Sequence, residues 1–394
     1  MGSPADIRSL RLPPAPAHEE VPFNRPFVSG GERALIEQVL DQDYTAGNGP
    51  LADRCERLLR EATAAERVLL TNSGTGALEM SALLIDIGPG DEVILPSFTF
   101  VSTANAFVLR GATPVFVDIE PETLGLDPAR CAEAVGARTR AIVPVHYGGA
   151  AAEMDAIMAV ARQAGAWVVE DAAQGAFAAY RGRPLGTIGE LGVLSFHETK
   201  NLSCGEGGAL LVNDPELVDR AEVFQEKGTN RLRFVRGEIG AYTWIDVGSS
   251  FLMSEFSAAV LLAQLEEAEY ITGARREIWH AYHRAFADAE EAGILTRPLV
   301  PTHVHQNGHC YYVLARDGAA RDRAIARLAE QHIRAQFHYV PLHSSPAGRR
   351  YGRTHGRLRQ TDDIAARLLR MPMWIGLTIA DIDRITCATV EALT

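Results

Sequence analysis

The sequence predicts an α/β protein, with a mostly parallel seven-stranded sheet in a large domain and a smaller α+β domain at the C-terminus. Short apolar runs alternate with segments of helical spacing, which is typical of parallel sheets covered by helices. At 394 residues the chain is longer than one small core requires, so two unequal domains are expected. The predicted strands are residues 68–70, 92–95, 114–117, 141–145, 167–170, 193–196 and 209–212.

The order of these segments predicts three regions along the chain. Residues 1–25, rich in proline and alanine, are expected to form an extended arm that could reach a neighbouring subunit. Residues 26–255 are expected to form the large domain, and residues 256–394 a long connecting helix and the small domain. The other predicted elements are helices at residues 32–40, 51–62, 254–286 and 321–332 and strands at residues 310–315 and 335–340.

Composition and charge argue against several classes of protein. The formal net charge of −12 disfavours nonspecific binding to nucleic acid. No apolar run approaches the roughly 18 residues of a membrane span, and the first residues lack the basic and apolar segments of a secretion signal. The five cysteines lie far apart, without the paired spacing of a disulfide framework or a zinc cluster. We therefore expect a cytoplasmic protein with free thiols and with neither a membrane nor a nucleic-acid partner.

Lysine is almost absent from this chain. Only two of its 38 lysines and arginines are lysines, Lys200 and Lys227. An arginine guanidinium stays protonated, whereas a lysine amine can lose its proton and attack a carbonyl. Lys200 lies between a predicted strand and the glycine-rich residues 205–208, a placement suited to a Schiff-base lysine. The codon bias of a GC-rich genome would also leave few lysines, so this observation is weighed with those that follow.

Other groups that suit a phosphorylated, planar cofactor also follow predicted strands. Ser73, Gly74 and Thr75 stand between a strand and a helical segment, where backbone amides and hydroxyls can hold a phosphate. Phe98 follows the next strand and could stack on a planar ring. Taken singly, the turn is explained as well by a helix cap, and the aromatic ring by core packing.

A carboxylate follows the buried run at residues 167–170. Asp171 would need a positive partner there, because an unpaired buried charge is costly, and a protonated pyridine nitrogen would be one. A helix-capping aspartate is the alternative. However, the phosphate turn, Phe98, Asp171 and Lys200 each follow a strand of one sheet, and ligands bind at the carboxyl ends of such strands. Their joint occurrence favours a single cofactor site.

These residues and motifs resemble those of the DegT/DnrJ/EryC1/StrS sugar aminotransferases, pyridoxal-phosphate enzymes of fold type I. The resemblance runs from about Pro22 to the C-terminus. It implies an aminotransferase with a large cofactor-binding domain and a smaller C-terminal domain. The motifs that carry it are residues 73–75, 96–104, 170–174 and 195–208.

The resemblance also implies a role for each motif residue. Lys200 would hold pyridoxal 5′-phosphate and move the proton between amino donor and cofactor, while Asp171 keeps the pyridine nitrogen protonated. Gln174 would contact the phenolic oxygen, and Phe98 would stack on the ring. Ordinary packing or capping would equally explain several of the substrate contacts. The implied cofactor contacts are Ser73, Gly74, Thr75, Phe98, Asp171, Gln174, Ser195, Lys200 and Asn230, and the implied substrate contacts are Tyr147, His197, Lys227, Arg231 and His338.

Two positions depart from the family pattern. Many members carry Asn and Arg in a segment that approaches the cofactor phosphate across the dimer, where this chain has Ser250 and Leu252. Lys227, Asn230 or Arg231 would then replace that contact. The resemblance therefore implies a homodimer with both cofactors near the interface.

Several segments most resemble the branch that acts on thymidine-diphosphate 4-keto-6-deoxyglucose. The implied reaction transfers the amino group of L-glutamate to C4 of this dTDP-sugar. A 3-keto nucleotide-sugar aminotransferase and a noncatalytic cofactor-binding regulator are the alternatives. Dehydratases of the family place histidine where Lys200 stands, and a metal hydrolase using His303, His305 and His309 lacks acidic neighbours, so no metal is expected. The branch-like segments are residues 226–231, 242–244, 248–251 and 337–343.

Overall fold

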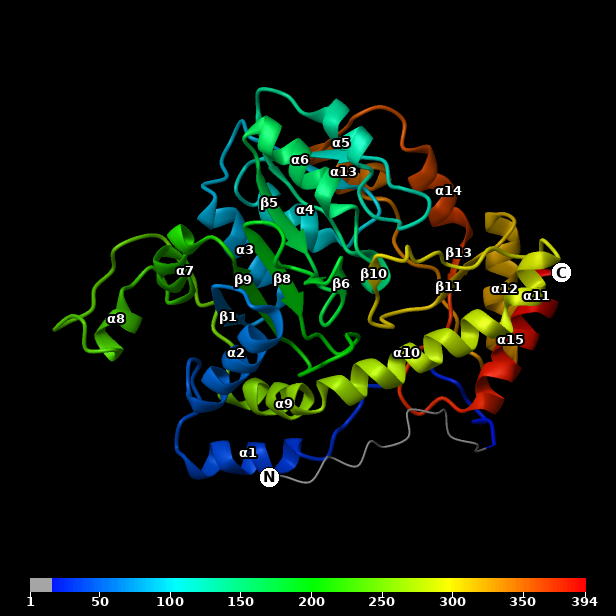
Figure 1. Ribbon diagram of the computed structural model, residues 1–394, viewed down its shortest axis with the longest axis horizontal. Coiled ribbons are helices and arrows are strands. Elements are labelled where there is room, and N and C mark those ends of the chain that lie inside the picture. Colours follow the sequence, from blue (N-terminus) through cyan, green and yellow to red (C-terminus); the bar gives the residue numbers. More distant parts are fainter. Residues whose placement is uncertain (1–15) are drawn as a thin grey trace.

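The computed structural model describes residues 16–394, and its main feature is an eight-stranded sheet (Figure 1). The sheet is parallel except for β9, which pairs antiparallel with both of its neighbours. All seven predicted strands are present, and the eighth, β12, comes from the C-terminal part of the chain and pairs with β3. In spatial order the strands are β1 (Arg67–Thr71), β9 (Gly208–Val212), β8 (Leu191–Ser195), β5 (Trp167–Asp171), β4 (Thr139–Ile142), β2 (Glu92–Pro96), β3 (Thr113–Val117) and β12 (Arg353–Thr354).

Helices cover both faces of this sheet, which explains why its strands are apolar without alternation. Val68 and Leu70 pack in one core and Leu69 in the other, because successive side chains of a strand point to opposite faces. The first face is covered by α2 (Pro50–Thr63), α5 (Pro128–Ala134), α6 (Met154–Ala164) and α9 (Glu255–Glu266), and the second by α3 (Gly74–Leu84), α4 (Val101–Val108) and α7 (Val218–Gln225).

The C-terminal part forms a smaller body around its own apolar core, at the right of Figure 1. A two-stranded antiparallel sheet of β11 and β13 packs there with helices. The elements of this body are α10 (Ala268–Ala285), α11 (Ala287–Glu291), β11 (Tyr312–Leu314), α12 (Gly318–Glu330), α14 (Arg359–Arg367), β13 (Leu368–Arg370) and α15 (Ile379–Leu393). The remaining elements are α1 (Glu32–Asp41), α8 (Arg231–Val235), α13 (Pro346–Tyr351), β6 (Ala179–Tyr180), β7 (Arg183–Pro184), β10 (Val304–His305) and 3-10 turns at Tyr147–Gly149, Pro215–Leu217 and Leu342–Ser344.

Two predicted elements differ in the structure. The helix expected at residues 254–286 is two helices, because the backbone leaves the helical conformation at Glu267 (φ −106°, ψ 13°). The break separates α9, which packs in the large core, from α10, which packs in the small one. The strand expected at residues 335–340 is reduced to a single bridge between Gln336 and Arg370. The chain beyond that bridge turns toward the large domain, where the Leu342 amide donates to the Ser97 carbonyl.

The described part of the N-terminal arm, residues 16–25, packs on the small domain of its own chain. The Val21 amide donates to the His332 carbonyl, and the Trp374 indole donates to the Pro22 carbonyl. These contacts correct the expectation of an arm that reaches a neighbouring subunit, as far as residues 16–25 are concerned. Residues 1–15 of the predicted arm lie outside the described residues.

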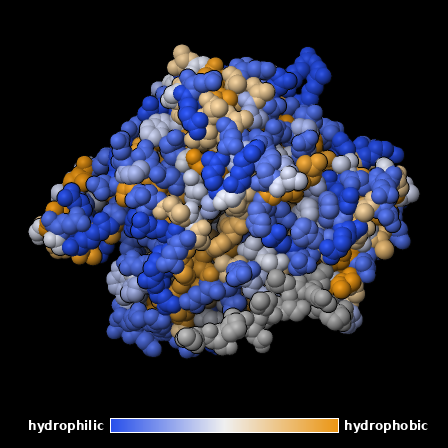
Figure 2. Space-filling model, viewed as in Figure 1, coloured by the Kyte–Doolittle hydropathy of each residue, from blue (hydrophilic) through white to orange (hydrophobic). Residues whose placement is uncertain are grey.

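A projecting segment, residues 227–251, extends away from the rest of the protein (left in Figures 1 and 2). It contains α8 and exposes several large apolar side chains, of which Trp244 is 76% exposed. Exposed apolar groups gathered on one element mark a surface for a partner. The exposed set is Phe234, Val235, Tyr242, Trp244, Ile245 and Val247. Among residues 16–394, no helix is both long and apolar enough to span a membrane.

Candidate active site

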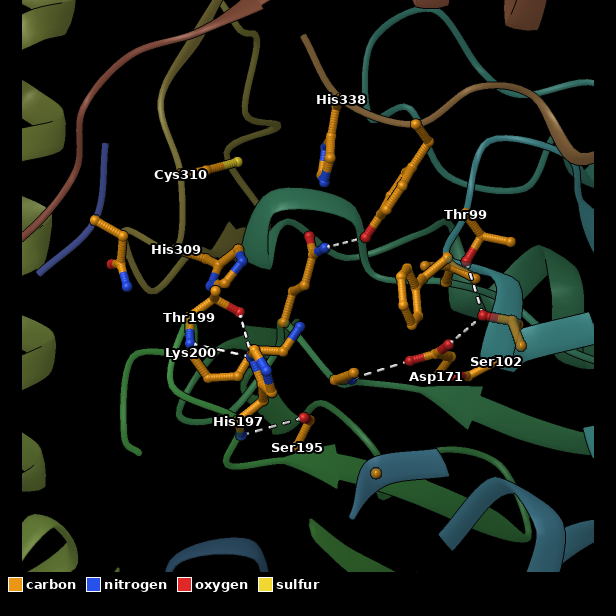
Figure 3. A pocket seen from close by; sticks show the side chains of 18 of the residues that line it. Thr99, Ser102, Asp171, Ser195, His197, Thr199, Lys200, His309, Cys310 and His338 are labelled. Carbon is orange, nitrogen blue, oxygen red and sulfur yellow. Dashed lines mark hydrogen bonds between the residues drawn. The ribbon is translucent and has the colours of Figure 1, made fainter. Parts of the chain in front are cut away.

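A cavity of about 700 Å³ opens at the carboxyl ends of the parallel strands, where the large and small domains meet (Figure 3). Asp171 ends β5, Ser195 ends β8, and Thr99 follows β2. The small domain contributes the opposite wall. Its lining residues include Arg275, His309, Cys310, Gln336, His338, Tyr339 and Arg370.

Lys200 lines this cavity from the turn that follows β8. Its backbone amide donates to the His197 carbonyl at 2.9 Å, which closes the turn. Burial lowers the pKa of the Lys200 amine; the Asp171 carboxylate raises that pKa, and the Arg370 guanidinium lowers it. A lowered pKa increases the share of neutral amine, which is the nucleophilic form.

Asp171 lies in the same cavity, and its carboxylate is held by two donors. The Thr103 hydroxyl donates to Oδ2 at 2.7 Å, and the Ala173 amide donates to Oδ1 at 3.1 Å. Within residues 16–394 the carboxylate forms no ion pair, and it supplies none of the side-chain caps of the described helices. The capping alternative is therefore not what the structure shows. The remaining lone pairs are available to a cationic ligand, such as a protonated ring nitrogen.

Ser73, Gly74 and Thr75 form the start of α3, and all three line the cavity. The Ser73 hydroxyl caps the helix by accepting from the Gly76 amide at 3.0 Å. A Cβ on Gly74 would stand 2.9 Å from Cβ of Ser195, so glycine permits the close approach of the two segments. The turn is thus both a helix cap and a set of hydroxyls and amides facing the cavity, as an anion site requires.

Gln174 bridges the two walls of the cavity. Its Oε1 accepts from the Gly148 amide at 2.6 Å, and its Nε2 donates to the Tyr339 hydroxyl at 2.7 Å. His338 lines the cavity beside Tyr339, and their rings stack with centroids 3.7 Å apart. Burial, together with the charges of Arg370 and Lys200, lowers the pKa of His338 well below its usual range, so its imidazole is neutral at pH 7.

Phe98 and Tyr147 lie behind the cavity wall. Each is 1% exposed, their ring centroids are 5.1 Å apart, and both belong to one apolar cluster. Neither is among the described residues that line the cavity. Tyr147 nevertheless reaches the site indirectly, because its hydroxyl lies 2.6 Å from Nδ1 of His338. The packing alternative therefore describes both residues in this chain. His197 does line the cavity, with its Nδ1 3.0 Å from the Thr199 hydroxyl.

Lys227, Asn230 and Arg231 are not brought to the cavity of their own chain. They lie at the base of the projecting segment, where Lys227 and Arg231 both pair with Glu226, at 3.5 and 2.9 Å. The Asn230 side chain accepts from the Thr243 amide at 2.8 Å. The structure thus separates these three predicted site residues from the other predicted residues of the cavity.

Some residues of the site are not predicted from the sequence. Ser102 and Thr103 face the cavity from α4, and the Ser102 hydroxyl lies 2.7 Å from that of Thr75. Arg275, His309, Tyr339 and Arg370 come from the small domain. Ser102 and Thr103 lie within the family-like residues 96–104, which is a signal that could have identified them.

The three histidines of the possible metal site have separate partners. His303 contacts Glu153 at 2.7 Å, His305 lies 3.0 Å from Nη1 of Arg276, and His309 lies 3.0 Å from Oδ1 of Asn201 in the cavity. Within the described part of the chain, no group of three His, Cys, Asp or Glu residues is arranged to hold a metal ion.

The cavity residues fit a bound pyridoxal 5′-phosphate. A hydroxyl-rich helix start, Ser73 to Thr75 with Ser195, suits its phosphate. An amine of lowered pKa, Lys200, suits its aldehyde. A carboxylate without a cationic partner among the described residues, Asp171, suits its ring nitrogen.

Comparisons with known proteins agree with this fit. A model of the DegT/DnrJ/EryC1/StrS aminotransferase family matches residues 29–390. The spore coat polysaccharide biosynthesis protein SpsC of Bacillus subtilis (strain 168) is 33% identical over 375 residues, covering 92% of this chain and 94% of SpsC.

Solved structures of related proteins share the fold. The aminotransferase TlmJ from Streptoalloteichus hindustanus is 30% identical, with a TM-score of 0.87 over 95% of this chain and 99% of TlmJ. DesV of S. venezuelae, solved in complex with a ketimine intermediate, is also 30% identical, with a TM-score of 0.85 and the same coverage. The chain therefore belongs to the DegT/DnrJ/EryC1/StrS family, and it is a pyridoxal 5′-phosphate-dependent sugar aminotransferase of fold type I.

Proposed function

We propose that this enzyme transfers the amino group of L-glutamate to C4 of dTDP-4-keto-6-deoxy-D-glucose, which gives a dTDP-4-amino-4,6-dideoxyhexose and 2-oxoglutarate. The observation that carries the chemistry is the placement of Lys200 and Asp171 in one cavity, facing the hydroxyl-rich start of α3. The choice of substrate is supported by the branch-like residues 337–343, because His338 and Tyr339 of that segment line the cavity.

The residues of the cavity have distinct tasks in this reaction. When bound, pyridoxal 5′-phosphate supplies an electron-withdrawing ring that stabilises negative charge on the carbon that loses its proton. Asp171 holds the proton on the ring nitrogen, because a carboxylate favours the charged form of a nearby base. The Lys200 amine removes the proton from the α-carbon of the donor as general base and returns one at the sugar carbon. Ser73, Thr75 and Ser195 would anchor the phosphate.

The position of the keto group is tested by offering 3-keto and 4-keto dTDP-sugars side by side, with glutamate as the donor. The 4-keto sugar is expected to be preferred by about 100-fold or more in kcat/KM, because a misplaced ketone loses alignment with the reacting amine. Formation of 2-oxoglutarate measures the rate, and proton couplings of the product give the configuration at C4. A preference for the 3-keto sugar would assign the enzyme to the alternative branch.

We further propose a homodimer in which the projecting segment of each subunit reaches the partner's cavity. Lys227, Asn230 and Arg231 lie outside the cavity of their own chain, on a segment that exposes six large apolar side chains. A second copy of the chain would bury these side chains, and it would bring cationic groups toward the phosphate or nucleotide of the ligands.

Mixed dimers test this arrangement. One subunit carries Lys200→Ala, and the other carries Asn230→Ala with Arg231→Ala, so each homodimer is expected to be inactive or weak. In a mixed dimer, one cavity combines an intact Lys200 with an intact projecting segment. An equimolar mixture should therefore regain about a quarter of the wild-type rate, since about half the dimers are mixed and each has one working site of two. No recovery after subunit exchange has been verified would contradict the crossing.

A further inference from the structure

Arg370 is a guanidinium in the active-site cavity that has no carboxylate partner among residues 16–394. Its Nε and Nη2 reach only the Phe337 carbonyl, at 3.4 and 3.3 Å. These distances exceed the ~2.9–3.0 Å of a typical N–H···O bond. The guanidinium carbon lies 4.6 Å from the centroid of the Phe23 ring, which supports one face of the group.

Neighbouring arginines are bound more firmly. Arg275 lines the same cavity, but its Nε and Nη2 donate to the Gly308 and His309 carbonyls at 3.1 and 2.7 Å. Arg367, one turn earlier in the chain, pairs with Asp363 at 2.6 Å. Among these three, Arg370 alone presents most of its donors to the cavity.

The charges of the described cavity lining leave room for an anion besides a phosphate. Three cationic side chains, Lys200, Arg275 and Arg370, face only two carboxylates, Asp171 and Glu206. The Glu206 side chain is 72% exposed and points away toward solvent. His309 and His338 add no positive charge, because burial lowers the pKa of both well below the usual value. An anionic ligand near Arg370 would offset the excess of positive charge.

The position of Arg370 distinguishes among the anions of the reaction. The hydroxyl-rich start of α3 belongs to the large domain, whereas Arg370 ends β13 of the small domain. Arg370 is close enough to Lys200 for its charge to act on the lysine amine. In an amino acid, the α-carboxylate is bonded to the carbon that carries the amine, so it lies beside the reacting nitrogen. In the sugar, the ring separates the diphosphate from C4.

We propose that Arg370 binds the α-carboxylate of the amino donor. This inference rests on the proposed function for the identity of that donor as glutamate. The planar fork of a guanidinium matches a carboxylate with two parallel hydrogen bonds, which a lysine cannot reproduce. Phe23, from the N-terminal arm, backs the guanidinium and also lines the cavity, so the docked arm completes this subsite.

The test separates the two half-reactions in Arg370→Gln holoenzyme. In the first, conversion of the cofactor by L-glutamate is followed by absorbance in single turnovers. In the second, the aminated enzyme is mixed with the dTDP-4-keto sugar, which has no carboxylate. The first half-reaction is expected to lose 10- to 100-fold in efficiency, the scale of a hydrogen bond to a charged group, and the second to change by less than about fivefold. Arg370→Lys should recover part of the loss.

A second comparison identifies the carboxylate itself. Wild-type enzyme should prefer glutamate over isoglutamine, in which the α-carboxylate is an amide, and Arg370→Gln should lose most of this preference. Arg334→Gln, a small-domain arginine whose nearest carboxylate is Glu20 at 3.9 Å, is the matched control and should keep it. Equal losses in both half-reactions, or an unchanged preference for glutamate, would overturn the inference.

The result for Arg370 can be told apart from the result for the donor. If wild-type enzyme does not react with glutamate, the proposed donor is wrong, and a screen of amino acids identifies the one that converts the cofactor. The comparison of Arg370→Gln with wild type is then made with that amino acid and its α-amide. A retained preference for the carboxylate in the variant would overturn the assignment of Arg370 whichever donor is used.

Discussion

Replacing Lys200 with alanine is expected to lower turnover of the cofactor-loaded enzyme by about 10⁴-fold, the upper end for loss of a general acid–base. Lys200 is the lysine that lines the cavity, whereas Lys227 lies on the projecting segment. The variant loses both the amine that holds the cofactor and the base that moves the proton. Single-turnover reaction with glutamate measures the loss.

Lys200→Arg separates charge from nucleophilicity. Arginine keeps the positive charge but cannot lose its proton at pH 7, so this variant should be as inactive as the alanine variant. Borohydride reduction of wild-type holoenzyme, followed by peptide mapping, should find the pyridoxyl mass on Lys200. An active arginine variant, or a pyridoxyl mass on Lys227, would contradict the assignment.

The large sheet could be predicted from the sequence because each of its strands is buried on both faces and therefore forms an apolar run. β12 and β13 could not, since they contain two and three residues and are held by pairing with β3 and β11. The break at Glu267 also left no local signal: no glycine or proline stands there, and the two helices differ in the core on which they pack.

The candidate site divides in the same way. Ser73, Asp171, Ser195 and Lys200 could be identified because each follows a strand, and the carboxyl ends of parallel strands converge. Arg370 could not be, because its place in the cavity depends on how the small domain packs against the large one. Phe98 follows a strand in the same manner, yet it turns into an apolar cluster rather than toward the cavity. Position after a strand thus predicts nearness to the site, but not the direction of a side chain.

Replacing Asp171 with asparagine is expected to lower turnover by about 10²- to 10³-fold, the scale on which removal of one electrostatic partner of the reacting group acts. The amide can still accept hydrogen bonds from Thr103 and from the Ala173 backbone, so the fold should be retained. It carries no charge, however, and cannot favour a protonated ring nitrogen. Thermal unfolding and cofactor content check integrity, and Asp155→Asn, at a half-exposed pair with Arg183, serves as the control. Activity near the wild-type value in Asp171→Asn would mean that the carboxylate only positions Thr103 and the turn after β5.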